Sequence, residues 1–210
     1  MAASRALVFD LDHTLVRSPL DLRAMAQDLL VFLRERGVAL PARESRWSAP
    51  EMARFVREQA PSLEADFWEI ALAHERRALL EVELEPGALE SLRAVRALGF
   101  RTAVWTNNDG AATRHVLEQF ALISHLDLVV TRQEVRHLKP DPDGLRVIAE
   151  RWPDLGEVFV VGDSWADGQA AGAGGVPFIA YRADHEELER RGVLVWAALA
   201  HLGDLPALFA

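Results

Sequence analysis

The chain of 210 residues contains no cysteine, which excludes disulfide bonds, thiolate zinc sites and cysteine nucleophiles. It also lacks any apolar run that approaches the roughly 18 residues needed to cross a bilayer. Half of the residues are nevertheless hydrophobic and 26% are charged, a composition that excludes general disorder. The sequence therefore predicts a soluble globular protein with a sizeable core.

Positive charge is scarce as well. The 23 lysines and arginines face 32 acidic residues, which gives a net charge of −9. This balance argues against nucleic acid as the partner, because phosphate backbones require a basic surface. The apolar stretch before the first aspartate, residues 6–9, is too short for a signal-peptide core. We expect a cytoplasmic protein without a membrane partner.

Lysine is the rarest charged residue type. Of the 23 basic side chains, 22 are arginine, and Lys139 is the single lysine. A chain that uses arginine almost everywhere still has lysine at this position, which marks Lys139 as a candidate for a specific function.

Short apolar runs alternate with helix-like segments over much of the chain. Each run ends in or just before a polar residue, a pattern typical of strands that are buried on both faces. The expected strands are residues 6–9, 100–106, 127–131, 158–161 and 177–181, and the expected helices between them are 110–120, 143–152 and 165–173. The alternation predicts an α/β fold with a Rossmann-like, doubly wound parallel sheet.

Residues 17–85 carry no strand signals and indicate a helical insertion. Ser18 followed by Pro19 and Asp21 resembles an N-cap with proline at the first helical position. Together with apolar residues at helical spacing up to Gly37 and a break at Pro61, it predicts several helices. We therefore expect a helical cap domain at 17–85, inserted into a core domain. The core would comprise 1–16 and 86–210, with helices at 88–99 and 184–191. The periodicity of residues 194–202 does not distinguish strand from helix.

The first expected strand is followed by acidic residues at alternate positions. Asp10, Asp12 and Thr14 lie in the sequence DLDHT. If the backbone stays extended, the two carboxylates share a side and lie about 7 Å apart along the chain. Two such acids repel each other unless a cation lies between them. By itself the motif fits two interpretations equally well. One is a cation site, and the other is an Asp10 that caps a turn with an Asp12 that is solvated.

Other strand ends supply complementary groups. The second strand ends in Thr106-Asn107-Asn108, the loop after the third contains Lys139-Pro140, and the fourth ends in Gly162-Asp163-Ser164, with Asp167 one helical turn further on. In a parallel sheet these ends meet at one edge, where ligands bind. Carboxylates suit a hard cation such as Mg²⁺, whereas hydroxyl, amide and ammonium donors suit phosphate oxygens.

In this order, DLDHT, Thr106, Lys139-Pro140 and GDSWAD resemble the four signature motifs of the haloacid dehalogenase (HAD) superfamily. The helical insertion after the first motif resembles the type 1 cap of its phosphatase branch, which includes phosphoglycolate phosphatases. The resemblance covers nearly the whole chain. It implies a Rossmann-like core and Mg²⁺-dependent hydrolysis of a small phosphate monoester through an aspartyl-phosphate intermediate.

The resemblance also implies catalytic roles for individual residues. Asp10 would be the nucleophile, and Asp12 the general acid and base. Thr106 and Asn107 would bind the phosphoryl group. Lys139 would pair with both Asp10 and the phosphate, which reduces the repulsion between two anions that must meet.

A metal site is implied by the same motifs. Asp163 would bind Mg²⁺ together with Asp10 and the backbone carbonyl of Asp12. Asp167 would contribute to this site through a water molecule, or would orient Lys139.

Alternatives within the superfamily differ in their chemistry. The dehalogenase branch lacks an aspartate at the position of Asp12, and phosphonate hydrolysis requires a cap lysine, which residues 17–85 do not contain. A sugar-phosphate mutase and a non-catalytic binding protein of the same fold stay open. Arg17, Arg46, Trp47 and His74 are candidates for contacting a leaving group. The sequence does not decide among phosphoglycolate, a sugar phosphate and a nucleotide as substrate, and it does not give the oligomeric state.

Overall fold

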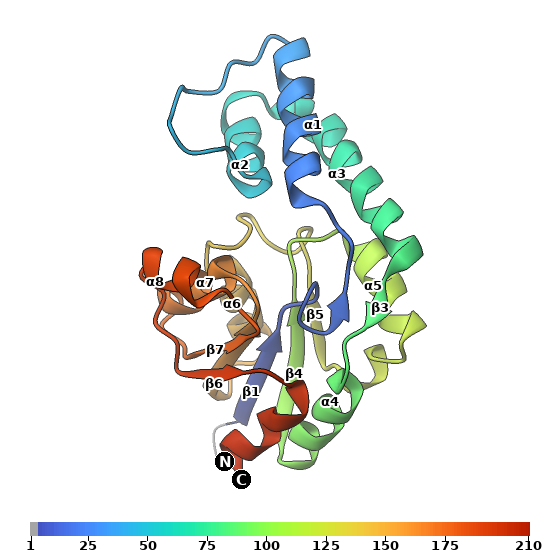
Figure 1. The fold of residues 1–210 in the computed structure, drawn as a ribbon, viewed down its shortest axis with the longest axis vertical. Helices are drawn as coiled ribbons and strands as arrows, with labels where there is room; N and C mark the ends of the chain where they lie inside the picture. Colours follow the sequence, from blue (N-terminus) through green and yellow to red (C-terminus); the bar gives the residue numbers. More distant parts are fainter. Residues whose placement is uncertain (1–3) are drawn as a thin grey trace. The chain divides into compact units, whose positions relative to one another are not determined.

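The computed structural model describes residues 4–210, and residues 1–3 of the expected core segment 1–16 lie outside the described residues (Figure 1). The contacts divide the chain into two compact units. The first contains the described residues up to Ser18 together with Val82–Ala210, and the second is Pro19–Glu81. Each unit is built around its own hydrophobic core.

The first unit contains a six-stranded sheet in the order β5-β4-β1-β6-β7-β8, in which all neighbouring strands are parallel (Figure 1). The strands are β1 (Ser4–Phe9), β4 (Phe100–Trp105), β5 (Leu128–Val130), β6 (Leu155–Gly162), β7 (Phe178–Tyr181) and β8 (Ala197–Leu199). The central neighbours β4, β1 and β6 carry the three sequence motifs that end in Thr106, Asp12 and Asp163. The predicted parallel α/β sheet is thereby confirmed.

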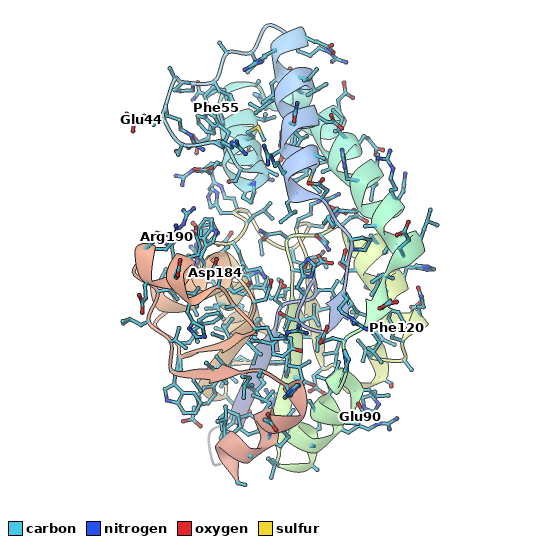
Figure 2. All side chains as sticks on the ribbon, in the orientation of Figure 1. Glu44, Phe55, Glu90, Phe120, Asp184 and Arg190 are labelled. Carbon is cyan, nitrogen blue, oxygen red and sulfur yellow. The ribbon has the colours of Figure 1, made fainter. Side chains whose placement is uncertain are left out.

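The helices of this unit follow the strands along the chain. They are α4 (Ala88–Ala97), α5 (Gly110–Gln119), α6 (Asp143–Arg151), α7 (Trp165–Ala173) and α8 (His185–Arg190), with 3-10 segments η3 (Ile123–His125) and η4 (Leu202–Phe209). Figure 2 shows all side chains and labels Asp184 and Arg190 at the two ends of α8. The undecided tail segment forms β8, because residues 197–199 pair with β7.

The side chains on both faces of the central strands are buried, which explains why these strands are continuous apolar runs in the sequence. Val8 and Trp105 join a cluster with residues of α6 and α7. Their neighbours Leu7 and Val104 point to the opposite face and are also fully buried. A sheet covered on both faces has no solvent-facing side chains to interrupt the apolar pattern.

The second unit consists of α1 (Leu22–Glu35), α2 (Ala49–Gln59) and α3 (Glu64–Ala78), with 3-10 segments η1 (Pro61–Leu63) and η2 (Leu79–Glu81). The expected cap at Ser18 is wrong, because α1 begins at Leu22 and its N-cap is Asp21, whose side chain accepts from two backbone amides at 2.9 and 3.0 Å. Ser48 and Glu51 form a capping box at the start of α2. Apolar residues from all three helices form the core of this unit.

Two very short strands were not predicted from the sequence. The strand β2 (Val16–Arg17) pairs antiparallel with β3 (Glu83–Leu84), although no strand signal is present in residues 17–85. Because of this pairing, residues 17–18 and 82–85 belong to the first unit rather than to the helical insertion. Among residues 4–210 no helix is long and apolar enough to cross a membrane.

Candidate active site

The candidate site is built at the carboxyl ends of β1, β4 and β6. The Asp10 amide still donates to the Val161 carbonyl at 2.9 Å, so the extended pairing with β6 continues up to this residue. The chain then turns sharply, with the Leu11 carbonyl accepting from Thr14, Leu15 and Val16. This tight loop places Asp10 and Asp12 at the sheet edge where α/β proteins bind ligands.

The single lysine lies at the centre of this edge. Its Nζ donates to Asp10 Oδ1 at 2.5 Å, to Asp167 Oδ1 at 2.6 Å and to the Trp105 carbonyl at 2.9 Å. An ammonium group has three donors, and all three are used. With only 4% of its side chain exposed, Lys139 forms a buried ion pair with each of two carboxylates.

Three carboxylates lie close enough to hold one metal ion. Oxygen atoms of Asp10, Asp163 and Asp167 all lie within 4.8 Å of one another. Both oxygens of Asp167 also accept hydrogen bonds, since Oδ2 accepts from the Ser164 amide at 3.1 Å and from its hydroxyl at 2.5 Å. The donor set is all oxygen, as a hard divalent cation prefers.

Burial strongly affects the protonation of this cluster. Desolvation raises the pKa of Asp10 well above its usual range, and the positive charge of Lys139 partly offsets the increase. Desolvation, with repulsion from Asp167, raises the pKa of Asp163 to about 7. Repulsion among the neighbouring carboxylates adds to both increases, and a divalent cation would favour the ionised forms.

The segment after β4 contains Thr106 and Asn107, two predicted phosphate-binding residues. The Asn107 amide clamps the backbone of Lys139, accepting from its N–H at 2.9 Å and donating to its carbonyl at 3.1 Å. The buried Thr106 hydroxyl accepts a hydrogen bond from the backbone N–H of Asn108 at 3.2 Å. The structure thus gives Asn107 a positioning contact, whereas its predicted contact with the substrate stays a prediction.

Asn108 is a site residue that the sequence reasoning missed. Its Nδ2 donates to Asp12 Oδ2 at 2.5 Å, although the two residues are 96 positions apart. The only signal in the sequence was its place two residues after Thr106, just beyond the expected second strand. A donor at this distance holds one carboxylate oxygen of Asp12 in a defined position.

The leaving-group candidates each have contacts or surroundings of their own. Arg17 pairs with Glu83 at 3.0 Å, and His74 contacts Asp28 at 2.8 Å. Arg46 and Trp47 line a cavity of the second unit. The structure therefore gives each of them a local environment, and their contact with a substrate stays a prediction.

The first unit thus combines a Rossmann-like α/β fold with an acidic, lysine-centred cluster at its strand ends. The model of the haloacid dehalogenase-like hydrolases matches residues 4–175. A phosphoglycolate phosphatase from Nitrosospira multiformis is 30% identical over 81% of this chain and 80% of its own length. One from Cereibacter sphaeroides is 32% identical over 82% of both chains.

Solved structures agree with the fold. A hydrolase from Pseudomonas syringae superimposes with a TM-score of 0.70 at 22% identity, over 95% of each chain. A HAD-superfamily hydrolase from Geobacter sulfurreducens superimposes with a TM-score of 0.62, also at 22% identity, over 100% of this chain and 98% of its own. The chain belongs to the haloacid dehalogenase-like hydrolase family, in its phosphatase branch. The predicted family, fold and enzyme class are thereby confirmed.

Proposed function

We propose that this phosphatase hydrolyses a small organic phosphate monoester through an aspartyl-phosphate on Asp10 and requires Mg²⁺. The observation that carries the proposal is the buried contact of the single lysine with Asp10 at 2.5 Å, beside Asp163 and Asp167. A lysine in this position holds a nucleophilic carboxylate and also offers positive charge to an incoming phosphate.

In the first step, a carboxylate oxygen of Asp10 attacks phosphorus while the bond from phosphorus to the ester oxygen breaks. Asp12 gives its proton to the leaving alkoxide, so that an alcohol departs. Lys139 reduces the repulsion between Asp10 and the phosphoryl oxygens. The hydroxyl of Thr106, a residue that is 2% exposed and directly follows β4, binds one of those oxygens.

In the second step, Asp12 accepts a proton from a water molecule, whose oxygen attacks phosphorus. The bond from phosphorus to Asp10 breaks, and inorganic phosphate leaves with Asp10 regenerated. Asn108 holds the Asp12 carboxylate during both proton transfers through the contact at 2.5 Å.

Mg²⁺ would be held by the side chains of Asp10 and Asp163 and by the backbone carbonyl of Asp12. When bound, the ion supplies positive charge that orients the phosphoryl group and stabilises the charge that develops on it. Asp167 would act through water and through Lys139, because both of its oxygens already accept hydrogen bonds.

The substrate of the named relatives, phosphoglycolate, is the first candidate for this chain. The helical unit 19–81 would serve as the cap that selects the leaving group. The cytoplasmic location and the lack of a nucleic-acid partner stay predictions from composition.

The test is phosphate release from phosphoglycolate, sugar phosphates and nucleotides, with Mg²⁺ and with a chelator, by the natural chain and Asp10→Asn. We expect metal-dependent release from at least one ester, and a loss of about 10⁴-fold or more in the variant, as is typical when a covalent nucleophile is removed. Asp154→Asn is the matched control, because that carboxylate pairs with Arg101 on the surface. Chelator-resistant release, or turnover by Asp10→Asn at the natural rate, would contradict the proposal. Transfer of phosphate to a second hydroxyl of a sugar phosphate would indicate a mutase.

A further inference from the structure

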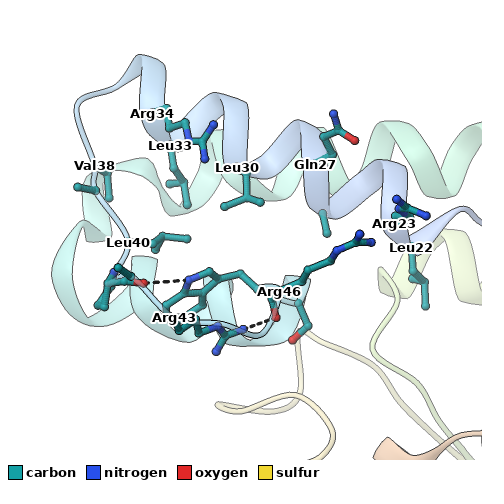
Figure 3. A pocket seen from close by; sticks show the side chains of 16 residues that line it. Leu22, Arg23, Gln27, Leu30, Leu33, Arg34, Val38, Leu40, Arg43 and Arg46 are labelled. Atoms are coloured by element: carbon teal, nitrogen blue, oxygen red, sulfur yellow. Dashed lines mark hydrogen bonds between the residues drawn. The ribbon is translucent and has the colours of Figure 1, made fainter.

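The second unit contains a cavity of about 890 Å³ between α1 and the segment of residues 38–48 (Figure 3). This volume lies in the range of roughly 300–1,000 Å³ that is typical of small-molecule pockets. Leu30, Leu33 and Leu40 contribute to an apolar wall. All the described lining residues belong to this unit, so the cavity exists within the helical insertion by itself.

The charge of the cavity is opposite to that of the chain. Four arginines line it and none of the described lining residues is acidic, although the whole chain carries −9. Arg43 is neutralised by Glu51, with contacts at 2.7 and 2.8 Å. Arg23, Arg34 and Arg46 form no ion pair with any of residues 4–210, so their charges are available to a ligand.

Two of these unpaired arginines are directed at the same space. Figure 3 shows the Arg46 side chain extending from the loop toward Arg23 of α1. Two guanidinium groups that face each other repel, and an anion between them removes the repulsion and accepts their hydrogen bonds.

The loop wall is held in place by contacts of its own. Arg43 donates to the Ser45 carbonyl at 3.0 Å and also to the Arg46 carbonyl. Its guanidinium lies 3.9 Å from the ring centre of Trp47, whose Nε1 donates to the Pro41 carbonyl at 3.3 Å. Because these contacts need no ligand, less ordering is required when a ligand binds.

We propose that this cavity binds an amphiphilic organic anion. The apolar body of the ligand lies against Leu30, Leu33 and Leu40. Its carboxylate, sulfonate or phosphate head lies between Arg23 and Arg46. The inference goes beyond phosphate hydrolysis, because it assigns a second ligand site in which no covalent bond changes.

The experiment uses two fluorescent dyes that share an apolar body and differ in charge. Anilinonaphthalene sulfonate (ANS) carries a sulfonate head, and N-phenyl-1-naphthylamine lacks it. We expect the full chain to bind ANS saturably at one site, about tenfold more tightly than the neutral dye, as charge-assisted hydrogen bonds predict. Arg23→Gln, Arg46→Gln and their double variant should lose this preference by weakening ANS alone.

Two further variants separate the cavity from general dye adsorption. Arg54→Gln removes a surface arginine of α2 that pairs with Glu58 outside the cavity, and it should bind both dyes as the natural chain does. Ala26→Phe fills the cavity and should weaken both dyes. Asp10→Asn should leave both affinities unchanged, so this test is independent of the hydrolytic mechanism. Equal affinity for the two dyes, or ANS binding unaffected in Arg23→Gln/Arg46→Gln, would overturn the proposal.

Discussion

The strand ends of the first unit and the cavity of the second unit both carry unbalanced charge, with opposite signs. At the strand ends, one buried lysine contacts two carboxylates in a group of four, and burial raises the pKa values of Asp10 and Asp163. In the cavity, three arginines have no ion-pair partner within residues 4–210. The sign of the excess charge predicts a cation at the first site and an anion at the second.

The two regions also differ in how deeply their charged groups are buried, and therefore in how strongly those charges interact. Lys139 and Asp167 are almost fully inaccessible, so their interaction is weakly screened. Arg23 and Arg46 are exposed, and solvent screens their charges. Substitutions at the strand ends should therefore change activity by orders of magnitude, whereas substitutions around the cavity should change affinity or stability modestly.

The largest effect is expected from Lys139→Met. Without the ammonium group, the burial that raises the pKa of Asp10 is no longer partly offset, so the protonated, non-nucleophilic form of this carboxyl group is favoured. We expect kcat to fall by about 10³-fold or more, the size of a lost transition-state interaction in a buried site. Leaving Asp167 buried without its cation should also cost about 3–5 kcal/mol of unfolding free energy. Steady-state kinetics and urea unfolding measure the two effects.

A second substitution separates stability from catalysis at Lys139. Lys139→Met/Asp167→Asn also removes the uncompensated charge of Asp167 and should recover part of the stability while staying inactive. Arg146→Met is the control, because this exposed arginine pairs with Asp141 and Asp143, in α6 and the loop before it. Turnover by Lys139→Met within tenfold of the natural rate would contradict a catalytic role for the single lysine.

Sequence reasoning predicted the parts of the site that follow local rules. Asp10 and Asp163 each follow an unbroken apolar run, and Lys139 stands out as the single lysine. The missed parts depend on contacts between distant residues. A strand of two residues, such as β2, has too few positions to show a period, and its pairing with β3 depends on the whole insertion that separates them. The contact between Asn108 and Asp12 likewise follows from the β4-β1 neighbourhood and from no pattern within either segment.

An intermediate effect is expected from Asn108→Ala. Loss of the contact at 2.5 Å frees the Asp12 carboxylate, and misplacement of a proton donor typically costs about 10²-fold in rate. We expect kcat/KM for an alkyl phosphate to fall by this amount, because its alkoxide needs a proton to leave. For p-nitrophenyl phosphate, whose leaving group needs no proton, the loss should be much smaller.

The comparison variant is Asn107→Ala, whose side chain holds the Lys139 backbone instead of Asp12. Its loss should affect both esters equally, because Lys139 acts on the phosphoryl group common to both. If Asn108→Ala lowered kcat/KM equally for the two esters, the contact of Asn108 with Asp12 would be structural and would not serve proton transfer.

The smallest effect is expected from Glu51→Gln, which perturbs the one cavity arginine that is already paired. The hydrogen bond from Arg43 lowers the pKa of Glu51 from 4.5 to about 2. Because the folded pKa is the lower one, the stabilisation is fully present above pH 4.5 and is lost as the pH falls toward 2. The Glu51 side chain is 45% exposed, so screening limits the expected loss at pH 7 to about 0.5–1 kcal/mol.

The difference in thermal stability between Glu51→Gln and the natural chain should therefore be full at pH 7 and shrink as the pH falls from 4.5 toward 2. Glutamine retains an acceptor for the Ser48 amide, so the cap of α2 is kept and the difference reports the pair with Arg43. The freed guanidinium adds positive charge beside the cavity, which should tighten ANS binding by about twofold, the size of a screened surface charge. Weaker ANS binding in this variant would mean that Arg43 acts through the fixed position of the loop and not through its charge. The cavity would then depend on a preformed wall, as the strand-end site depends on its buried lysine.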